Sequence, residues 1–361
     1  MNVTNNVGFN TDYIYQHFSE EDYRQFPEYF IAPINLVWEL TAECKSNCQY
    51  CFGGFHEKME HELSKEERIA LAKEIVAMKV FNITLSGGEP LLCDQLPEIV
   101  DILYQGGVNV IICTSGFNMT EELAEKLVRS YKVGFNISMD SFHSEKNDIA
   151  RGKKGASEAA IHAVNIIRKV GGEQVPISLE CVLTKNNLED INEYIEEARK
   201  LGVLGVKFQP MIAIGKGKRV QDIALDVQEI EEAEKKIRKL YQEVYQELLS
   251  GIREDFLHID FVDQSKHITL GLKTGINWGG IIEPDGRLRP SGYLDIVFDN
   301  YKDFGSYQKM WDEGFKQVWN HPFFVSLQGK VNNVKDIEAV SDTHQIHGIT
   351  LKVEYIKRSE E

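Results

Sequence analysis

Between residues 34 and 210, short apolar runs alternate with longer stretches whose apolar residues recur at helical spacing. Six runs have the length and composition of buried strands: 34–40, 81–85, 108–113, 133–139, 175–183 and 203–209. Five stretches are predicted helices: one that begins after Ser64, and 92–105, 120–129, 156–170 and 188–201. Successive strand–helix units predict a parallel sheet with right-handed crossovers. We therefore expect an α/β fold, a partial barrel of six units, which are too few to close a barrel of eight.

Local signals agree with the ends of several predicted helices. Ser64 and Glu67 form a capping box, in which each side chain accepts a hydrogen bond from a backbone amide at the helix start. Gly106-Gly107 and Gly171-Gly172 each follow a helix, as glycine does at helix C-termini. The boundaries indicated by these residues match those indicated by periodicity.

The pattern differs outside this region, so we predict three parts. Residues 1–33 are polar and aromatic at irregular spacing, as in a capping segment, and 34–210 form the barrel. Residues 211–361 form a smaller α+β extension. It begins with a charged helix at 226–250 whose apolar stripe packs on the domain edge, or alternatively binds a partner. It continues with short strands and the hairpin turn Pro284-Asp285-Gly286.

Composition narrows the classes of function. The chain has 361 residues, of which 42% are hydrophobic, enough for a substantial core. Its 56 acidic residues outnumber its 40 basic ones, which argues against nonspecific nucleic-acid binding. No apolar stretch has the length of a membrane span. Six cysteines without a preceding export signal predict a reducing, cytoplasmic setting.

Three cysteines lie within eight residues, directly after the first predicted strand. Cys44, Cys48 and Cys51 are separated by three and then two residues, so a tight loop can turn all three sulfurs toward one point. Three cysteines cannot all pair as disulfides among themselves. A structural zinc knuckle completed by His56 is one interpretation. An iron–sulfur cube, which can leave one iron open for a substrate or cofactor, is the other.

The motif Cys44-x-x-x-Cys48-x-Tyr50-Cys51 resembles the signature of the radical S-adenosylmethionine (radical SAM) superfamily. The stretch 85–90, Leu-Ser-Gly-Gly-Glu-Pro, follows one helix later and resembles the second signature of that family. The resemblance implies that the three thiolates hold one 4Fe–4S cluster, whose fourth iron binds the amino and carboxylate groups of S-adenosylmethionine (SAM). It also implies an open partial barrel, with ligands at the carboxyl ends of the strands.

The same resemblance implies contacts with SAM. Gly87 and Gly88 let the backbone approach a ligand closely, and Glu89 is an acceptor for the SAM amino group. Tyr50 is expected near the adenine. Arg151 resembles the arginine that pairs with the SAM carboxylate, which suits the two-pronged guanidinium, although a surface arginine is the alternative. The remaining expected contacts are Thr114, Ser115, Ser138 and Asp140.

The other three cysteines, Cys93, Cys113 and Cys181, show no ligand spacing with a neighbour. A small buried hydrophobe is the default interpretation of a free cysteine in a strand. Cys181 lies in the fifth predicted strand, where alternate residues point inward, and is a candidate donor of a hydrogen atom to a substrate radical. Cys93, close to the 87–89 loop, is the second candidate.

The segment 277–291 resembles the hairpin that opens the SPASM domain of peptide-modifying radical SAM enzymes, and short segments within 304–320 resemble its next turn and helix. In that family, cysteines that ligate auxiliary clusters stand where this chain has Asn277 and Ser291. The last cysteine of the sequence is Cys181. We therefore expect a SPASM-like scaffold without auxiliary clusters.

Together these features predict a radical SAM enzyme. The resemblance implies that the reduced cluster passes one electron to SAM, and that the resulting 5′-deoxyadenosyl radical abstracts hydrogen from the substrate. The tail favours a ribosomally made peptide, modified by crosslinking, oxidation or epimerisation; an oxidoreductase or mutase acting on a small molecule is the alternative. A non-catalytic iron–sulfur redox sensor is a third hypothesis, against which the SAM motif counts. An electron donor such as flavodoxin or ferredoxin is the expected protein partner.

Overall fold

The computed structural model describes residues 33–57, 59–129, 132–252, 257–262, 279–289 and 305–315, and the backbone alone of 337–346 and 349–358. Contacts divide the chain into two compact units. The first comprises 1–43, 57–111 and 264–361, and the second comprises 44–56 and 112–263. Strand β3 (Asn109–Thr114) crosses this boundary. The three-part division predicted above stays a prediction.

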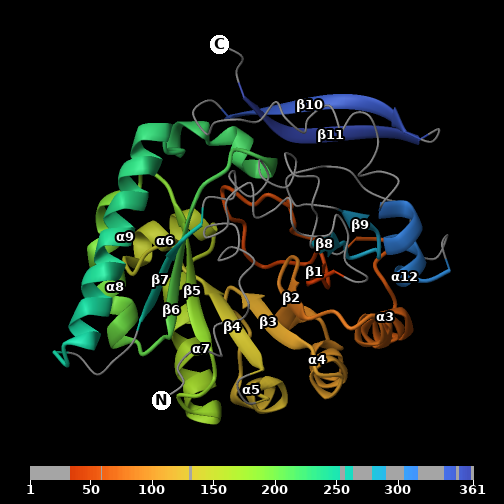
Figure 1. The fold of residues 1–361 in the computed structure, drawn as a ribbon, viewed down its shortest axis with the longest axis horizontal. Coiled ribbons are helices and arrows are strands. Elements are labelled where there is room, and N and C mark those ends of the chain that lie inside the picture. The colour runs from red at the N-terminus through yellow and green to blue at the C-terminus, as the bar shows by residue number, and fades with distance from the viewer. Residues whose placement is uncertain are drawn as a thin grey trace. The chain divides into compact units, whose positions relative to one another are not determined.

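The first unit is built around β1 (Asn35–Glu39), which pairs in parallel with β2 (Asn82–Ser86) on one edge and β8 (Gly279–Ile282) on the other. Strand β9 (Leu288–Arg289) is antiparallel to β8. The helices of this unit are α3 (Lys65–Ala77), α4 (Leu96–Gln105) and α12 (Tyr307–Lys309), with the 3-10 turn η1 (Pro90–Leu92) and the π-helical turn η5 (Met310–Phe315). A two-stranded antiparallel ribbon, β10 (Ile337–Ile346) and β11 (Ile349–Arg358), completes the described backbone (Figure 1).

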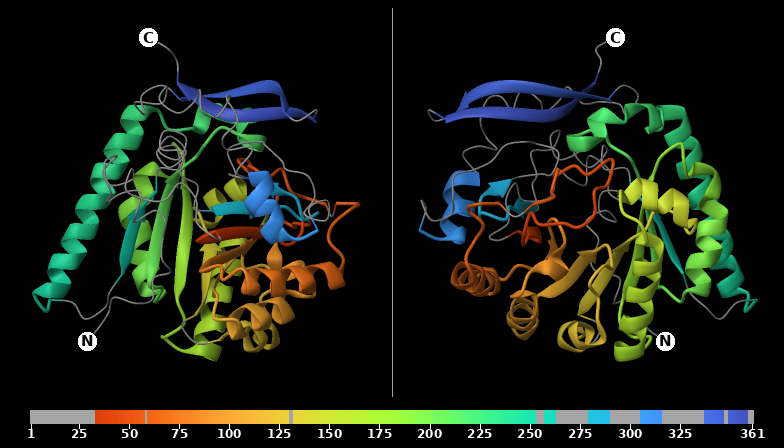
Figure 2. Two further views of the ribbon diagram at one scale, coloured as in Figure 1. Left: turned by 45° about the vertical axis from the view of Figure 1, so that its right-hand side comes forward. Right: turned by 180° about the vertical axis from the view of Figure 1, so that it is seen from behind.

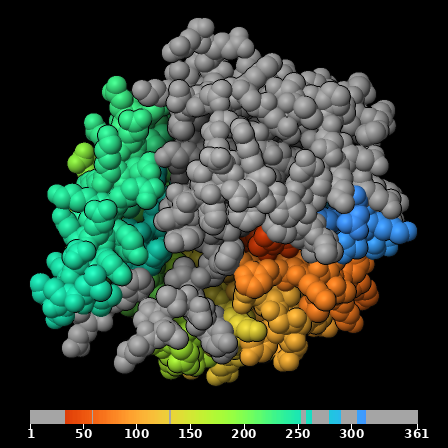
Figure 3. All heavy atoms as spheres, viewed as in Figure 1, coloured from red at the N-terminus to blue at the C-terminus, as the bar shows by residue number. Residues whose placement is uncertain are grey.

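The second unit contains four parallel strands, paired in the order β7 (His258–Phe261), β6 (Gly205–Pro210), β5 (Ile177–Leu183) and β4 (Val133–Ser138). Its helices are α5 (Glu121–Leu127), α6 (Ser144–Arg151), α7 (Ala156–Gly171), α8 (Ile191–Lys200) and α9 (Val227–Leu249), with 3-10 turns η2 (Leu188–Asp190), η3 (Gly215–Arg219) and η4 (Gln221–Ile223). Figure 2 shows the strands of this unit from two further sides. Helix α9 packs on β7, and its buried residues Ala233, Ile237 and Val244 belong to the predicted apolar stripe. Figure 3 shows this segment at the surface of the second unit.

The strands β1 to β9 belong to one mostly parallel sheet, so the predicted α/β fold is confirmed. Each of the six predicted strands is present within two residues of its expected ends. The structure adds β7, a further parallel strand, and β8, which lies on the free edge of β1. Both have only four residues; they lie in the region for which short strands were predicted without bounds, and β8 is one strand of the hairpin predicted around Pro284-Asp285-Gly286. Among the described residues, we find no helix that combines the length and the apolar character needed to cross a membrane.

Capping boxes begin two of the described helices. Ser64 Oγ accepts from Glu67 N and Glu67 Oε2 accepts from Ser64 N, so the predicted capping box is confirmed. Asp226 and Glu229 form a second box at the start of α9. The helix predicted from residue 92 begins at Leu96, because Pro90–Leu92 forms a 3-10 turn first. Helix α6 was not predicted; Asn147 is its buried residue.

The predicted turn Pro284-Asp285-Gly286 joins β8 to β9. Glu283 N donates to Arg287 O at 2.8 Å, and Gly286 N donates to Glu283 O at 2.9 Å, which closes the hairpin. The buried Arg289 attaches this hairpin to β1, since its guanidinium lies 3.4 Å from Glu39 and 3.0 Å from Glu283. Asn277 and Ser291, where the family has cysteines, lie outside the described residues.

The carboxyl group of Glu39 is 1% exposed. Burial raises the pKa of Glu39 from 4.5 to about 7, although the Arg289 charge opposes the shift. Between these values the folded chain keeps a proton that the unfolded chain releases, so stability must fall as pH rises through this range. The full shift corresponds to about 3 kcal/mol.

We therefore expect the free energy of unfolding to decrease between pH 4.5 and pH 7 in the protein, and to vary less in Glu39→Gln. Urea unfolding at a series of pH values measures both slopes. Glu66→Gln, on the first turn of α3, is the control and should keep the slope of the unmodified protein. An unchanged slope in Glu39→Gln would show that this carboxyl group does not titrate in the range.

Candidate functional site

The three motif cysteines lie in the loop 44–56 of the second unit, and all three are partly exposed and form no disulfide with a described residue. Backbone hydrogen bonds hold the loop against the end of α6: Asn47 N donates to Arg151 O at 3.0 Å, and Gln49 N donates to Ala150 O at 3.1 Å. On its far side, Lys216 N donates to Cys51 O at 3.0 Å. The loop is therefore fixed by its backbone, independently of any ligand.

Gly152 makes this close contact between loop and helix achievable. It caps α6 at φ 59°, and a Cβ atom at this position would lie 2.0 Å from Asn47 O. Any side chain would thus force the cysteine loop away from α6.

In the described part of the chain, the structure gathers no three His, Cys, Asp or Glu side chains into an arrangement that could hold a metal ion. The loop thus brings the three thiols together in one segment without converging them on one point. Burial raises the pKa of the Cys48 thiol, although the Arg151 charge opposes this. A metal ligand must be a thiolate, so binding would release the proton.

The donor chemistry of the loop nevertheless fits a metal–sulfur cluster. It supplies three cysteine thiols outside any described disulfide, and thiolates are the ligand type that iron–sulfur clusters take. Two buried donors of this region, Ser46 Oγ and Arg151 Nε, have no hydrogen-bond partner in the described structure. Buried donors of this kind need acceptors, and the sulfurs of an anionic cluster are acceptors.

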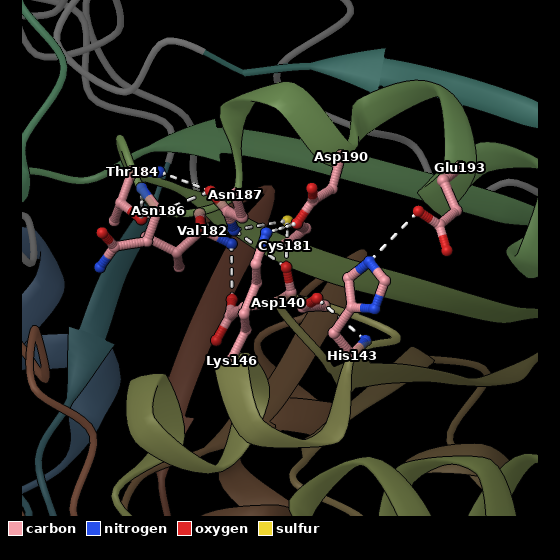
Figure 4. A network of polar contacts seen from close by, with 11 residues as sticks. Asp140, His143, Lys146, Cys181, Val182, Thr184, Asn186, Asn187, Asp190 and Glu193 are labelled. Carbon is pink, nitrogen blue, oxygen red and sulfur yellow. Dashed lines mark hydrogen bonds and ion pairs between the residues drawn. The ribbon is translucent and has the colours of Figure 1, made fainter.

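Asp140, which follows β4, is the most connected buried carboxylate of the second unit (Figure 4). Its side chain accepts from the Tyr50 hydroxyl and from Val182 N (2.8 Å), and lies 3.6 Å from the Arg151 guanidinium. Its own amide donates to Asn147 Oδ1 at 2.9 Å. Asp140 therefore joins the cysteine loop, α6 and β5.

Charge and burial act on the two partners of Asp140 in opposite ways. Burial, and next the Asp140 charge, raise the pKa of Tyr50 well above its usual value, so Tyr50 stays a neutral donor. Burial alone would lower the pKa of Arg151, but the negative charges of Cys48 and Asp140 outweigh it. Arg151 is thus a fixed cation beside the cysteine loop.

The residues that were predicted to contact SAM lie partly in this network around Asp140. Tyr50, Asp140 and Arg151, each expected to contact SAM, contact one another in the structure. Ser138, the last residue of β4, is half-buried, and Ser115 is buried after β3. The next residue, Gly116, donates from its amide to Thr114 Oγ1 at 3.0 Å. The contacts of these residues with SAM stay predictions.

The Gly87-Gly88-Glu89 turn of the first unit packs on the chain that leads into the cysteines. Gly88 N donates to Thr41 O at 2.7 Å, and Glu89 N donates to Glu43 O at 2.8 Å. A Cβ atom on Gly88 would lie 2.2 Å from Glu43 O, and one on Gly87 2.5 Å from Thr41 O. Both glycines are thus required by backbone packing, whatever they do for a ligand. The buried Glu89 side chain accepts from Leu91 N at 3.2 Å.

Sequence reasoning missed Glu62, which holds both ends of the cysteine loop. Its Oε1 atom accepts from Thr41 Oγ1, Ala42 N and Met59 N at 2.9–3.1 Å. Its Oε2 atom is 2.9 Å from the guanidinium of Arg68, which also donates to Leu40 O. No motif marks Glu62, because two of its four partners are backbone amides, which any residue supplies.

The structure places Cys181 on the face of β5 that α8 covers. Cys181 is paired in register with Phe208, whose ring packs edge-on against Tyr194 of α8. Its thiol contacts Asp140 O and Asn187 Nδ2, as Figure 4 shows, and burial raises its pKa well above the ordinary value. This is the helix side of the strand, and not the inward side on which its predicted role as a hydrogen donor relies.

Cys93, the second candidate donor, is buried after η1 and lies 3.9 Å from Gln95 Oε1. Burial raises the pKa of its thiol. Cys113 is half-buried in β3. The roles of Cys93 and Cys181 stay predictions.

Comparison with known proteins finds a family model that covers both motifs. The model of the Radical SAM superfamily matches residues 38–198. The mycofactocin maturase MftC of Mycolicibacterium smegmatis is 28% identical over 303 residues, which cover 82% of this chain and 72% of that protein. The AdoMet-dependent heme synthase of Methanosarcina barkeri is 29% identical over 194 residues, which cover 54% of this chain and 55% of that protein.

Solved structures show the same fold. Streptococcus suis SuiB bound to its precursor peptide SuiA superposes with a TM-score of 0.63 at 13% identity, over 85% of this chain and 69% of that chain. Native anSMEcpe with bound AdoMet superposes with a TM-score of 0.61 at 18% identity, over 83% and 84% of the two chains.

We expect Asp140→Ala to cost about 3–5 kcal/mol of unfolding free energy, because it leaves Arg151 buried without its carboxylate and Val182 N without an acceptor. Asp140→Asn should cost less, since an amide oxygen can still accept from Val182 N. Urea unfolding of the protein without metal measures both.

The matched control is Asp190→Ala, which removes a carboxylate paired with Lys146 near the surface of the same region (Figure 4). A surface pair contributes about 0–1 kcal/mol. Equal losses for Asp140→Ala and Asp190→Ala would contradict a central role for Asp140.

Proposed function

We propose that this chain, which belongs to the radical SAM superfamily through residues 38–198, modifies a ribosomally made peptide by radical chemistry. The main support is the length of the similarity to MftC, which is named a maturase. The aligned region has 303 residues and extends well beyond the residues that the radical SAM model matches. The heme synthase matches only 194 residues. A similarity that includes the C-terminal extension favours the maturases, because substrate choice depends on parts outside the shared catalytic core.

Proteins of this superfamily use a 4Fe–4S cluster and SAM, which together supply a 5′-deoxyadenosyl radical when bound. In this chain, Cys44, Cys48 and Cys51 would hold the cluster, and Gly87-Gly88-Glu89 would bind the amino group of SAM. The backbone contacts described above keep both segments in place before either ligand arrives. A flavodoxin or ferredoxin would supply the electron.

The contribution of the protein is positioning and exclusion of water. Within the second unit the Asp140 network holds the cysteine loop, and within the first unit Glu62 holds the residues that flank this loop in the sequence. Residues 182–361 contain no cysteine. This region therefore offers no thiolate for an auxiliary cluster, and the fate of the substrate radical would depend on the first cluster, on SAM or on a hydrogen donor.

A small-molecule substrate is the second candidate. The likeness to the heme synthase and to the Fe-coproporphyrin III synthase of Methanosarcina barkeri, 28% identical over 199 residues, favours it. These matches cover about half of this chain. We rank this candidate below a peptide for that reason.

After anaerobic reconstitution we expect about four irons per chain, and 5′-deoxyadenosine on addition of dithionite and SAM. Replacement of Cys44, Cys48 and Cys51 together by Ala should abolish both, whereas Cys113→Ala should leave both intact. Iron analysis, absorption spectra and chromatography provide the readouts. A reduced cluster that forms no deoxyadenosine would instead support the redox-sensor hypothesis.

The substrate class is tested with any short peptide found to be encoded next to the gene for this chain, and with an iron porphyrin in a parallel reaction. We expect a mass change in the peptide: loss of two hydrogens for a crosslink or oxidation, or uptake of deuterium from heavy water for epimerisation. Mass spectrometry of both reactions decides between the candidates. Conversion of the porphyrin alone would overturn the peptide proposal.

A further inference from the structure

Ser46, between the first two motif cysteines, is an exception among the buried serines of the second unit. It is 3% exposed, and its hydroxyl has no hydrogen-bond partner in the described structure. By contrast, Ser141 Oγ accepts from His143 N at 3.1 Å, and Ser157 Oγ donates to Ser141 O at 3.3 Å. An unsatisfied buried hydroxyl costs free energy, so its presence calls for an acceptor.

The backbone of the loop keeps Ser46 in place. Its neighbour Asn47 is held at both ends: the amide donates to Arg151 O, and the side-chain oxygen accepts from Lys216 Nζ at 2.8 Å. Gly152 leaves no space between this part of the loop and α6. The backbone around Ser46 is therefore restrained within the described structure, and a group bound by the loop can supply the missing acceptor.

We propose that the hydroxyl of Ser46 donates a hydrogen bond to a sulfur of the group held by Cys44 and Cys48, and so raises its reduction potential. The inference rests on the proposed cluster-binding function. Reduction adds negative charge, and a donor stabilises the more negative state. Cluster potentials are known to depend on hydrogen bonds to the sulfurs.

The test compares Ser46→Ala, Ser46→Thr and Ser157→Ala as reconstituted proteins without SAM. At a fixed solution potential, we expect the ratio of reduced to oxidised cluster to fall about tenfold in Ser46→Ala, equivalent to about 59 mV for one electron. Ser46→Thr, which keeps the hydroxyl, should restore the ratio. Ser157→Ala should not change it, because that hydroxyl has an acceptor in the protein.

Two further measurements separate this role from a structural one. Without metal, Ser46→Ala should unfold at the same or a higher urea concentration than the unmodified protein, since it removes an unsatisfied polar group, whereas Ser157→Ala should lose stability. In the reduced cluster, electron–nuclear double resonance should show a coupled exchangeable proton that is lost in Ser46→Ala alone.

An unchanged potential in Ser46→Ala at equal iron content would overturn the proposal. So would a loss of stability in that variant without metal, because it would reveal a partner within the protein. If the unmodified protein binds no iron, the proposed function itself fails. This outcome differs from the two results that would overturn only the role of Ser46.

Discussion

The cysteine loop depends on one buried carboxylate. The eight residues from Cys44 to Cys51 include four polar side chains and cannot form a core of their own. Asp140 supplies what the loop lacks, because a carboxylate taken out of water must be surrounded by donors. It recruits Tyr50 from the loop, Arg151 from α6 and Val182 N from β5. Satisfying one charge therefore fixes three elements relative to one another within the second unit.

The parts of the fold that could be predicted are those in which local pattern and tertiary environment agree. The six strands between 34 and 210 could be recognised because apolar residues that are buried in the sheet recur along each of them, as in β3 and β5, where buried and part-exposed residues alternate. Helix α6 escaped prediction, since its one buried residue is Asn147 and it has no apolar stripe. Its stability comes from tertiary hydrogen bonds at Ala150 and Arg151. Strands β7 and β8 were predicted only as unbounded short strands of the extension, because four residues carry too little periodicity to fix the ends of a strand.

The candidate site shows the same division. The motif identifies the three cysteines, but spacing cannot reveal that Tyr50, Asp140 and Arg151 contact one another across 101 positions of sequence. Alternation along β5 shows that Cys181 and Leu183 share a face, yet a period of two does not say which face is inward. The pairing of Cys181 with Phe208 decides that, and pairing is a tertiary fact. The sequence alone explains the glycines at 87 and 88 by close approach to a ligand. The structure adds a second reason, because a side chain at either position would collide with the backbone of residues 41–43.

The chain carries a net charge of -16, which would disfavour an anionic cluster if every charge acted alike. Exposed charges are screened over a Debye length of about 8 Å at physiological ionic strength, whereas buried ones are screened much less. The groups that decide the local potential are therefore those around the loop: the buried cation Arg151 and the buried hydroxyl of Ser46. Asp140 partly neutralises the charge of Arg151 and also keeps its guanidinium buried beside the loop, away from solvent. An acidic protein can thus hold an anionic metal site, because burial gives a few nearby donors more weight than many distant carboxylates.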